Sequence, residues 1–290
     1  MEISYSYLED EIRDGFYVDS LMKCSWAAQL NVLEVIDRIC QKHHIQYQAA
    51  WGTMLGVVRH GGFIPWDDDI DIMMPREDYD TLLKIWNDVA PAEYILMNGD
   101  TAEDCSGNFT KIVKDHTTFL QLEEDRIRDI HKGIFVDIFP GDRLAPTEFG
   151  RILQYCACAV NLLYSRGYTS KSGGIIEAIE RILLIVPQKY HRTLRKQAQR
   201  FISKWNSLTQ SPYIFPCTIK ECQKNYSPAL FDNLESFKFC KKHYFCTAHW
   251  DAYLTLSYGD YMQLPPEEER VWKHHPILID FEHNYEELSL

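Results

Sequence analysis

Apolar positions recur every three to four residues from 20 to 44, which predicts a helix with one buried face. The positions near that face are Trp26, Leu30, Leu33, Ile36 and Cys40. A short strand is expected at 45–50, followed by a helical turn at 54–58 and a glycine-rich loop. From 69 to 74 acidic and apolar residues alternate, which is typical of a strand with one buried face. Pro75 then opens a helix that runs to about Val89, because proline and carboxylates suit a first helical turn.

The second half of the chain begins with short strands and then becomes mainly helical. Strands are expected at 94–98, 110–114, 117–121 and 133–139, the last one stopped by Pro140-Gly141. Residues 146–207 have a helical pattern, broken at Gly173-Gly174 and at Pro187. The stretch FKFCKKHYFC, residues 237–246, predicts a hairpin. These elements predict an α/β or α+β protein, built on a small mixed sheet flanked by helices.

Composition narrows the class of protein. The chain has 290 residues and a net charge of −12, which argues against a protein that coats nucleic acid. Its acidic start lacks the basic and apolar regions of a secretory signal peptide, and no apolar run reaches the roughly 20 residues of a membrane span. The nine scattered cysteines predict reduced thiols. We therefore expect a cytoplasmic protein.

The run HGGFIPWDDDIDIMMP, residues 60–75, places four carboxylates beside a buried strand. Asp69 and Asp71 share one face of that strand, where they repel each other unless a cation lies between them. Asp137, inside the apolar run Val-Asp-Ile, is expected to join them from a neighbouring strand. Mg²⁺ binds few carboxylates together with substrate phosphates, so we predict a Mg²⁺ (or Mn²⁺) site at these three aspartates, which are also the predicted catalytic residues. The alternatives are an exposed turn and a weak Ca²⁺ loop.

Gly52 and Thr53 are candidates for contacting a phosphate. They follow a predicted strand and precede a helical turn, where glycine lets the backbone approach an anion and the helix amides attract it. The alternative is an ordinary turn. With the aspartates, this arrangement indicates metal-dependent transfer of a phosphorus-containing group.

Three stretches, in the same order along the chain, resemble the LicD-type phosphotransferases, a family that includes the fukutin-related transferases. They are WGTMLGVVRHGGFIPWDDDIDIMMPREDYDTLL (51–83), KGIFVDIFPGD (132–142) and YLTLSYGDYMQLPPEEERVWKHH (253–275). The resemblance implies an α+β nucleotidyltransferase-like fold with a helical insertion and a C-terminal closing segment. It also implies one domain over 1–290, with a core at 20–145, a helical segment at 146–208 and a C-terminal part at 209–290 that completes the site.

The resemblance further implies transfer of a phosphorylated alcohol, chiefly phosphocholine from CDP-choline, to a lipopolysaccharide, teichoic acid or capsule precursor, with release of CMP. By position it makes Asp69 and Asp71 the metal-binding pair and Asp137 the third metal carboxylate. Two rival functions remain open: a glycosyltransferase that uses Asp-x-Asp to hold a nucleotide sugar, and a membrane-surface or metal-binding protein without catalysis.

Other residues near the matched motifs are secondary candidates, each with a structural alternative. Arg59, His60 and Lys111 are expected to contact donor phosphates, although each suits an ordinary surface or packing role. Asp68 is expected to point elsewhere. The residues expected to support the carboxylates, close over the pocket or contact the acceptor are Asp67, Trp66, Tyr258, Arg270, His274 and His275. Aromatic residues that could face a quaternary ammonium group are Trp51, Trp66, Tyr258, Tyr261 and Trp272.

Two further patterns bear on ligands and location. The Cys240, His243, Cys246 and His249 series has zinc-like spacing, but a spacing of three alternates the faces of a strand, so we favour a hairpin. Residues 181–204 carry seven basic residues and no acid, with apolar residues between them. Such a segment is a solvated helical face or a peripheral contact with the inner membrane surface, which would suit a lipid-linked glycan acceptor.

Overall fold

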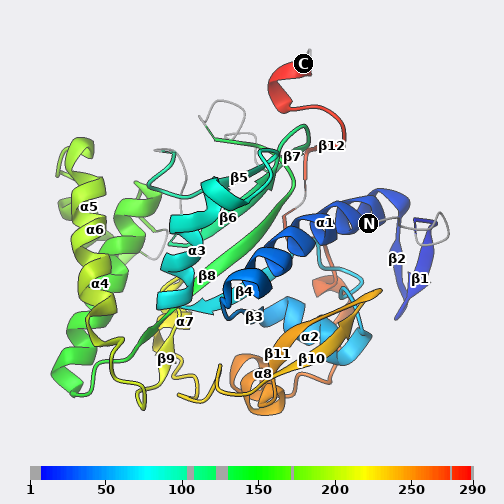
Figure 1. Cartoon of the computed structure of the whole chain (residues 1–290). Helices are drawn as coiled ribbons and strands as arrows, with labels where there is room; N and C mark the ends of the chain where they lie inside the picture. Colours follow the sequence, from blue (N-terminus) through cyan, green and yellow to red (C-terminus); the bar gives the residue numbers. More distant parts are fainter. Residues whose placement is uncertain (1–7, 103–107, 122–129, 171–172, 275, 289–290) are drawn as a thin grey trace.

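The computed structural model describes residues 8–102, 108–121, 130–170, 173–274 and 276–288. Its main sheet has the strand order β3-β4-β8-β6-β5, with β9 added beside β8 (Figure 1). The strands are β3 (Gln48–Ala49), β4 (Asp71–Pro75), β5 (Tyr94–Met97), β6 (Thr110–Lys114), β8 (Phe135–Arg143) and β9 (Tyr213–Ile214). Only the β4–β8 pair is parallel; the other pairs of this sheet are antiparallel. The predicted α+β class with a small mixed sheet is confirmed.

Strand β8 continues through Pro140 and Gly141, so the prediction that it stops at Phe139 is wrong. On one side it pairs with β6 as far as Ile138 and with β9 from Asp142 onward. Pro140 lies in the gap between these two partners. Proline has no backbone N–H to donate, and at Pro140 this side of the strand has no paired residue to accept one.

Helices cover both faces of the sheet. On one face lies α1 (Ser20–His43), whose Ala28 shares a buried cluster with Val113 and Phe135. On the other lies α3 (Arg76–Val89), where the Tyr79 hydroxyl is 2.6 Å from Thr110 Oγ1. Both helices match the predicted ranges closely.

Helix α2 (Trp51–His60) is longer than the predicted turn at 54–58. It begins at Trp51 because the Trp51 backbone N–H donates to the Tyr253 hydroxyl at 2.8 Å, a partner 202 residues away. The predicted Gly52-Thr53 turn is therefore the first turn of this helix.

The helical part lies to the left of the sheet in Figure 1. It consists of α4 (Glu148–Arg166), α5 (Gly174–Leu183), η3 (Gln188–Tyr190), α6 (His191–Ile202) and η4 (Ser203–Trp205). The predicted breaks are confirmed: Gly173 and Gly174 have φ of 68° and 66°, and Pro187 precedes η3. No helix in the described ranges combines the length and apolar character needed to cross a bilayer.

The remaining elements come mainly from the two terminal parts of the chain. The N-terminal hairpin is β1 (Glu11–Arg13) with β2 (Phe16–Val18), and β7 (Thr118–Leu120) pairs with β12 (Leu278–Asp280). The other elements are α7 (Ile219–Gln223), β10 (Leu234–Phe239), β11 (Lys242–Thr247), α8 (Trp250–Tyr258), η5 (Glu267–Glu269) and η6 (Tyr285–Glu287). The β10–β11 hairpin confirms the prediction at 237–246. Within β11, His243 is exposed and Cys246 is buried, so these two side chains do not point to a common zinc ion.

Candidate active site

Three neighbouring strands place charged residues side by side. Asp71 of β4 is paired in register with Asp137 of β8, and Asp137 is paired with Lys111 of β6. Paired residues on adjacent strands point to the same face, about 5 Å apart. Asp71, Asp137 and Lys111 therefore form one row across the sheet, as expected for two carboxylates that converge from separate motifs.

The loop before β4 brings three further aspartates to this row. Helix α1 fixes the loop backbone, since Trp26 Nε1 donates to the Asp67 carbonyl at 2.8 Å and Gln29 Nε2 to the Asp68 carbonyl at 2.6 Å. Thr53 Oγ1 accepts a hydrogen bond from the Asp71 backbone N–H at 2.9 Å. Thr53 thus holds the start of β4 in place from the first turn of α2.

Gly52 lies against the carboxylate of Asp67. A Cβ atom at Gly52 would be 2.5 Å from Asp67 Oδ2, so only glycine fits there without a shift. Asp67 is 3% exposed, and its Oδ1 atom accepts no hydrogen bond. Its nearest cation is Lys273, whose Nζ lies 3.8 Å from Oδ1.

We call Asp67, Asp68, Asp69, Asp71 and Asp137 the carboxylate cluster. Burial, together with the charge of Asp69, raises the pKa of Asp67 to about 7. Burial and the charges of Asp69 and Asp137 raise the pKa of Asp71 well above its usual value. The pKa values of Asp69 and Asp137 are also raised, first by burial, although His274 opposes the shift at Asp69 and Lys111 opposes it at Asp137. Burial is thus the largest cause of each raised pKa, and repulsion between carboxylates adds to it at Asp67, Asp69 and Asp71.

The C-terminal region supplies a partner that spacing could not reveal. His274 Nδ1 lies 2.8 Å from Asp68 Oδ1 and 3.7 Å from Asp69 Oδ2, and the His274 backbone N–H donates to Asp68 Oδ2. Although burial works against it, the hydrogen bond with Asp68 and the charge of Asp69 raise the pKa of His274. The prediction that Asp68 points elsewhere is wrong. Its carboxylate turns inward because His274 binds it.

Within the described ranges, one group of His, Cys, Asp and Glu side chains has ligand atoms that all lie within 4.8 Å of one another: Asp68, Asp69 and His274. Asp71 and Asp137 are outside this group, and Lys111 Nζ occupies the Asp137 carboxylate at 2.8 and 2.9 Å. Asp69 therefore belongs to the group with Asp68 and His274, and it also interacts through its charge with Asp137 of the row. The raised pKa values and the unbonded Asp67 Oδ1 fit a divalent cation, because such an ion would neutralise buried carboxylates that repel each other.

The side chains of Arg59 and His60 contact each other, Tyr261 and Asp14, which lie outside the carboxylate cluster. Arg59 donates to His60 Nε2 and to the Tyr261 carbonyl, each at 2.9 Å. His60 Nδ1 lies 3.0 Å from Asp14, and burial with the charge of Arg59 lowers the pKa of His60 to about 4. His60 is therefore neutral at pH 7.

Trp66 and Tyr258 lie close to these groups. The guanidinium groups of Arg59 and Arg270 lie 5.8 and 5.2 Å from the centre of the buried Trp66 ring. Tyr258 is 44% exposed as a residue; burial of its hydroxyl, with the charges of Asp67 and Asp71, raises its pKa. His275 lies outside the described residues.

Two residues that the sequence gave no reason to select help to shape the site. Trp51 Nε1 donates to Glu221 Oε2 at 3.1 Å and to the Tyr226 hydroxyl at 3.2 Å. Glu221 and Tyr226 lie far from Trp51 in the sequence, and no local motif marks them. Only the packing of the C-terminal part against α2 reveals the contact.

Residues 44–145 match the family model described as the LicD/FKTN/FKRP nucleotidyltransferase domain. This range contains every member of the carboxylate cluster, Gly52 and Thr53. This part of the chain is a LicD-type domain. The family resemblance stated from the sequence is thereby confirmed, and the nucleotidyltransferase domain makes the chain an enzyme of the transferase class.

Curated relatives extend the LicD match beyond this domain. The lipopolysaccharide cholinephosphotransferase LicD of Haemophilus influenzae is 29% identical over 267 residues, which cover 83% of this chain and 91% of the relative. Uncharacterized proteins of Rickettsia prowazekii and Rickettsia typhi are each 54% identical over 37 residues, 13% of this chain. The likeness to the Haemophilus protein therefore also includes most of the chain outside the LicD domain.

Proposed function

We propose that this transferase moves phosphocholine from CDP-choline to a glycan precursor of the cell surface, such as lipopolysaccharide, teichoic acid or capsule, and releases CMP. The observation that carries the proposal is the pairing of Asp71 with Asp137 across β4 and β8, with the charge of Asp69 acting on Asp71, beside a glycine that gives room for Asp67. The Haemophilus relative, named for cholinephosphate transfer to lipopolysaccharide, supports the choice of transferred group and acceptor.

Asp69, Asp71 and Asp137 would hold Mg²⁺ or Mn²⁺, with Asp68 and His274 next to Asp69. When bound, the ion would neutralise the cluster and offset the charge of the donor diphosphate. Lys111 adds a positive charge at the end of the row, where it would attract a donor phosphate. Gly52 and Thr53 would hold the Asp67 loop and the start of β4 in position beside that phosphate.

The acceptor hydroxyl must lose its proton as it attacks the phosphorus atom next to choline. Asp67 is the better acceptor of that proton, because its Oδ1 has no hydrogen-bond partner whereas both oxygens of Asp137 are bound by Lys111. The attack forms the new phosphorus–oxygen bond to the glycan, and the bond to the CMP oxygen breaks.

The proposal treats 1–290 as one functional unit. Residues 20–145 form the core that carries the cluster, residues 146–208 form the helical part, and residues 209–290 complete the site through Tyr253, Tyr258 and His274. A CDP-activated donor implies a cytoplasmic reaction, with a lipid-linked acceptor reached at the inner face of the membrane. Arg270 and Trp66 remain proposed contacts for the donor or acceptor at the rim, and His275 remains a candidate from the sequence.

Incubation with CDP-choline, Mg²⁺ and glycan acceptor, with CMP as the measured product, tests the proposal. We expect Asp69→Asn and Asp71→Asn each to reduce CMP release by about a hundredfold or more, since each removes a charge that a metal would need. Asp88→Asn, an exposed change on α3, is the matched control and should leave the rate unchanged. Near-normal turnover by Asp69→Asn would overturn the metal assignment.

The nucleotide product separates this proposal from the Asp-x-Asp glycosyltransferase. A glycosyltransferase of that type would use a nucleotide sugar and release a nucleoside diphosphate instead of CMP. A panel of CDP-alcohols and nucleotide sugars, read by product identity, therefore decides between them.

A further inference from the structure

Helix α5 exposes a stripe of isoleucines to solvent. Ile175, Ile176, Ile179 and Ile182 are 80, 62, 52 and 65% exposed, and no residue of this ten-residue helix is buried. Their spacing places all four on one face of the helix. Ile185, just after the helix, is 77% exposed. We call these five residues the isoleucine stripe.

Exposed apolar side chains in such a continuous set are unusual on a protein surface and indicate contact with another apolar phase. On the polar side of α5, Glu180 pairs with Arg166 of α4, whereas Glu177 and Arg181 pair within α5 itself. Helix α5 is therefore held to the protein by its polar side, and its apolar side has no covering element among the described residues.

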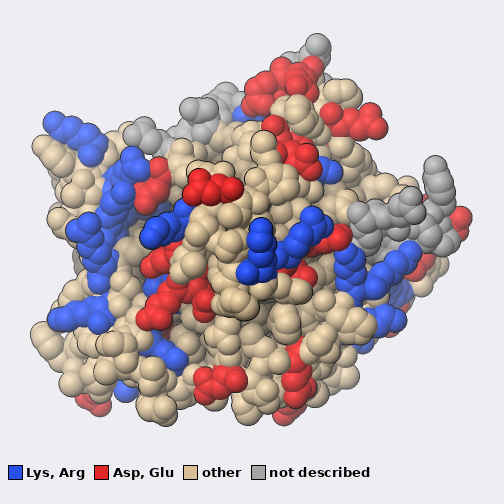
Figure 2. Space-filling model, viewed as in Figure 1, with Lys and Arg blue, Asp and Glu red and all other residues tan. Residues whose placement is uncertain are grey.

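Positive charge lies beside the end of the stripe, where Ile185, Arg192 and Arg195 line one hollow. Figure 2 shows lysine and arginine side chains gathered along the edge of the molecule formed by the helical part. The exposed lysines and arginines of residues 181–204 are Arg181, Lys189, Arg192, Lys196, Arg200 and Lys204. Residues 181–204 contain no acid, in a chain whose net charge is −12. The charge of this edge is thus opposite to that of the whole molecule.

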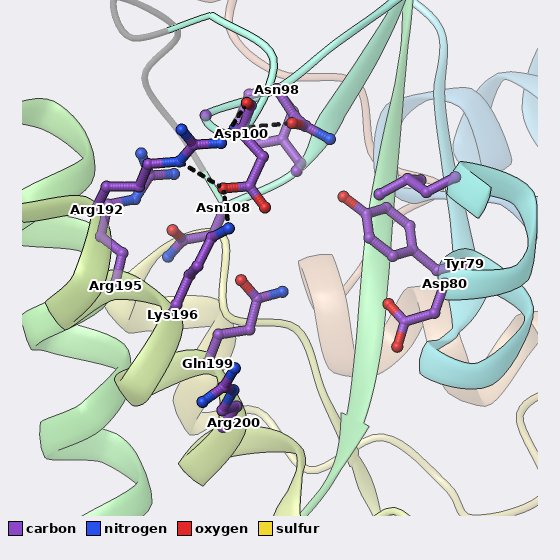
Figure 3. Close-up of a pocket in the computed structure, with 13 residues that line it drawn as sticks. Tyr79, Asp80, Asn98, Asp100, Asn108, Arg192, Arg195, Lys196, Gln199 and Arg200 are labelled. Carbon is purple, nitrogen blue, oxygen red and sulfur yellow. Dashed lines mark hydrogen bonds and ion pairs between the residues drawn. The ribbon is translucent and has the colours of Figure 1, made fainter. Parts of the chain in front are cut away.

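A hollow beside α6 shows how these cations are arranged. Arg192, Arg195, Lys196 and Arg200 line a cavity of about 290 Å³ between α6 and the end of β5 (Figure 3). Asp100 lies 3.3 Å from Arg192 Nε and 3.3 Å from Lys196 Nζ. Two acids, Asp80 and Asp100, thus line the hollow with four cations, so the hollow retains a positive charge that can attract phosphate groups.

We propose that the isoleucine stripe inserts into the boundary between headgroups and acyl chains of an anionic membrane, with the basic residues beside it contacting lipid phosphates. An apolar helical face flanked by cations is the arrangement that binds such a surface. Tyr168 and Tyr190, 66 and 50% exposed on either side of α5, suit the headgroup layer. This inference rests on the proposed function for its biological purpose, since a lipid-linked acceptor would be presented at that surface.

A second copy of the chain fits the stripe less well. A ten-residue helix is about 15 Å long, which is short for the roughly 800 Å² per partner that a stable interface buries. Two copies joined through this edge would also bring their basic residues together. An anionic bilayer offers an apolar phase to the stripe and negative charge to the cations.

Sedimentation with vesicles tests the proposal directly. The probes are vesicles of phosphatidylcholine alone and of phosphatidylcholine mixed with phosphatidylglycerol. We expect the protein to bind the anionic vesicles at least tenfold more tightly than the neutral ones, and the difference to shrink as salt is raised. Equal or absent binding to both vesicle types would overturn the proposal.

Matched variants identify the surface. Ile176→Gln/Ile179→Gln removes apolar area without adding charge and should weaken vesicle binding about tenfold or more. Ile12→Gln, which changes a 77% exposed isoleucine of β1 at the opposite side of the molecule, should bind like the unaltered protein (Figure 1). Lys189→Gln/Arg200→Gln should weaken binding to anionic vesicles, whereas Lys220→Gln/Lys238→Gln, both exposed elsewhere, should not.

Two readouts keep the inference separate from the chemistry. CMP release from soluble CDP-choline and a water-soluble acceptor should be unchanged in the isoleucine variant. Vesicle binding without any turnover would leave the membrane surface in place and contradict the proposed function instead. A dimer in light scattering that Ile176→Gln/Ile179→Gln dissociates would reassign the stripe to an interface between copies.

Discussion

At the scale of single residues, the site depends on a close contact between a glycine and a carboxylate. Gly52 is the first-turn residue of α2 that faces Asp67, and it leaves Asp67 Oδ2 just enough room. The contact means that Gly52 acts on the reaction through the position of Asp67.

We predict that Gly52→Ala reduces CMP release about tenfold or more while the thermal midpoint of unfolding changes little. The new Cβ would lie 2.5 Å from Asp67 Oδ2, and a side-chain carboxylate can move aside more easily than backbone. The comparison is Gly133→Ala, whose Cβ would lie 2.3 Å from the Lys114 backbone oxygen and should mainly lower stability. Full activity of Gly52→Ala would show that the position of Asp67 does not matter.

Residue identity alone predicted part of this site. Asp69, Asp71 and Asp137 could be selected because charges inside apolar runs are costly unless they have a purpose. Asp68 could not be placed, since its neighbours in sequence have the same charge and its partner His274 is 206 residues away. Lys111 was selected for phosphate, but its ion pair with Asp137 depends on strand order, which the sequence pattern does not give.

At the scale of elements, α3 is joined to the central strand by a buried ion pair. Arg76 donates from Nε to Asp142 Oδ1 at 2.9 Å and from a terminal nitrogen to Oδ2 at 2.7 Å, and Asp142 is fully buried. Asn206, just after η4, also donates to Asp142 at 2.9 Å. Asp142 thus ties α3 and the end of the helical part to β8.

We predict that Arg76→Met lowers the free energy of unfolding by about 3–5 kcal/mol, because it leaves the Asp142 charge buried without its main partner. The double change Arg76→Met/Asp142→Asn should recover part of that loss by removing the charge. Urea unfolding measures both. Arg38→Met, at a 69% exposed i,i+4 pair on α1, is the control and should change stability by about 1 kcal/mol or less.

Elements with strong local signals were predicted well. Residues 76–89 and 110–114 matched because periodicity, proline and capping acids are local properties. The continuation of β8 through Pro140 and the early start of α2 were missed, because each depends on a partner supplied by a distant strand or by Tyr253. Local pattern therefore predicts elements, and tertiary contacts decide where they end.

At the scale of the whole molecule, both ends of the described chain close on the LicD core. Arg270 donates to the Asp14 carbonyl at 3.2 Å, and Trp272 Nε1 lies 3.0 Å from Met22 Sδ on α1. Strand β12 pairs with β7, which holds the last segment against the core. These contacts bring His274 to the carboxylate cluster.

We predict that His274→Gln raises the Mg²⁺ concentration needed for half-maximal CMP release about tenfold, because neighbours that orient metal-binding carboxylates tune metal affinity. His283→Gln, at an exposed histidine that binds Asp280 in the same C-terminal region, is the matched control. A Mg²⁺ titration of CMP release measures the effect. Identical titrations for the two variants would remove His274 from the site.

The link between Asp68 and His274 also has a consequence for protein synthesis. Asp68 leaves the ribosome early, and its partner follows 206 residues later. The main buried core itself includes residues between Tyr213 and Leu254, so both the core and the Asp68–His274 contact stay incomplete until the C-terminal part is made. A prematurely terminated chain would therefore lack both part of its buried core and the histidine partner of Asp68.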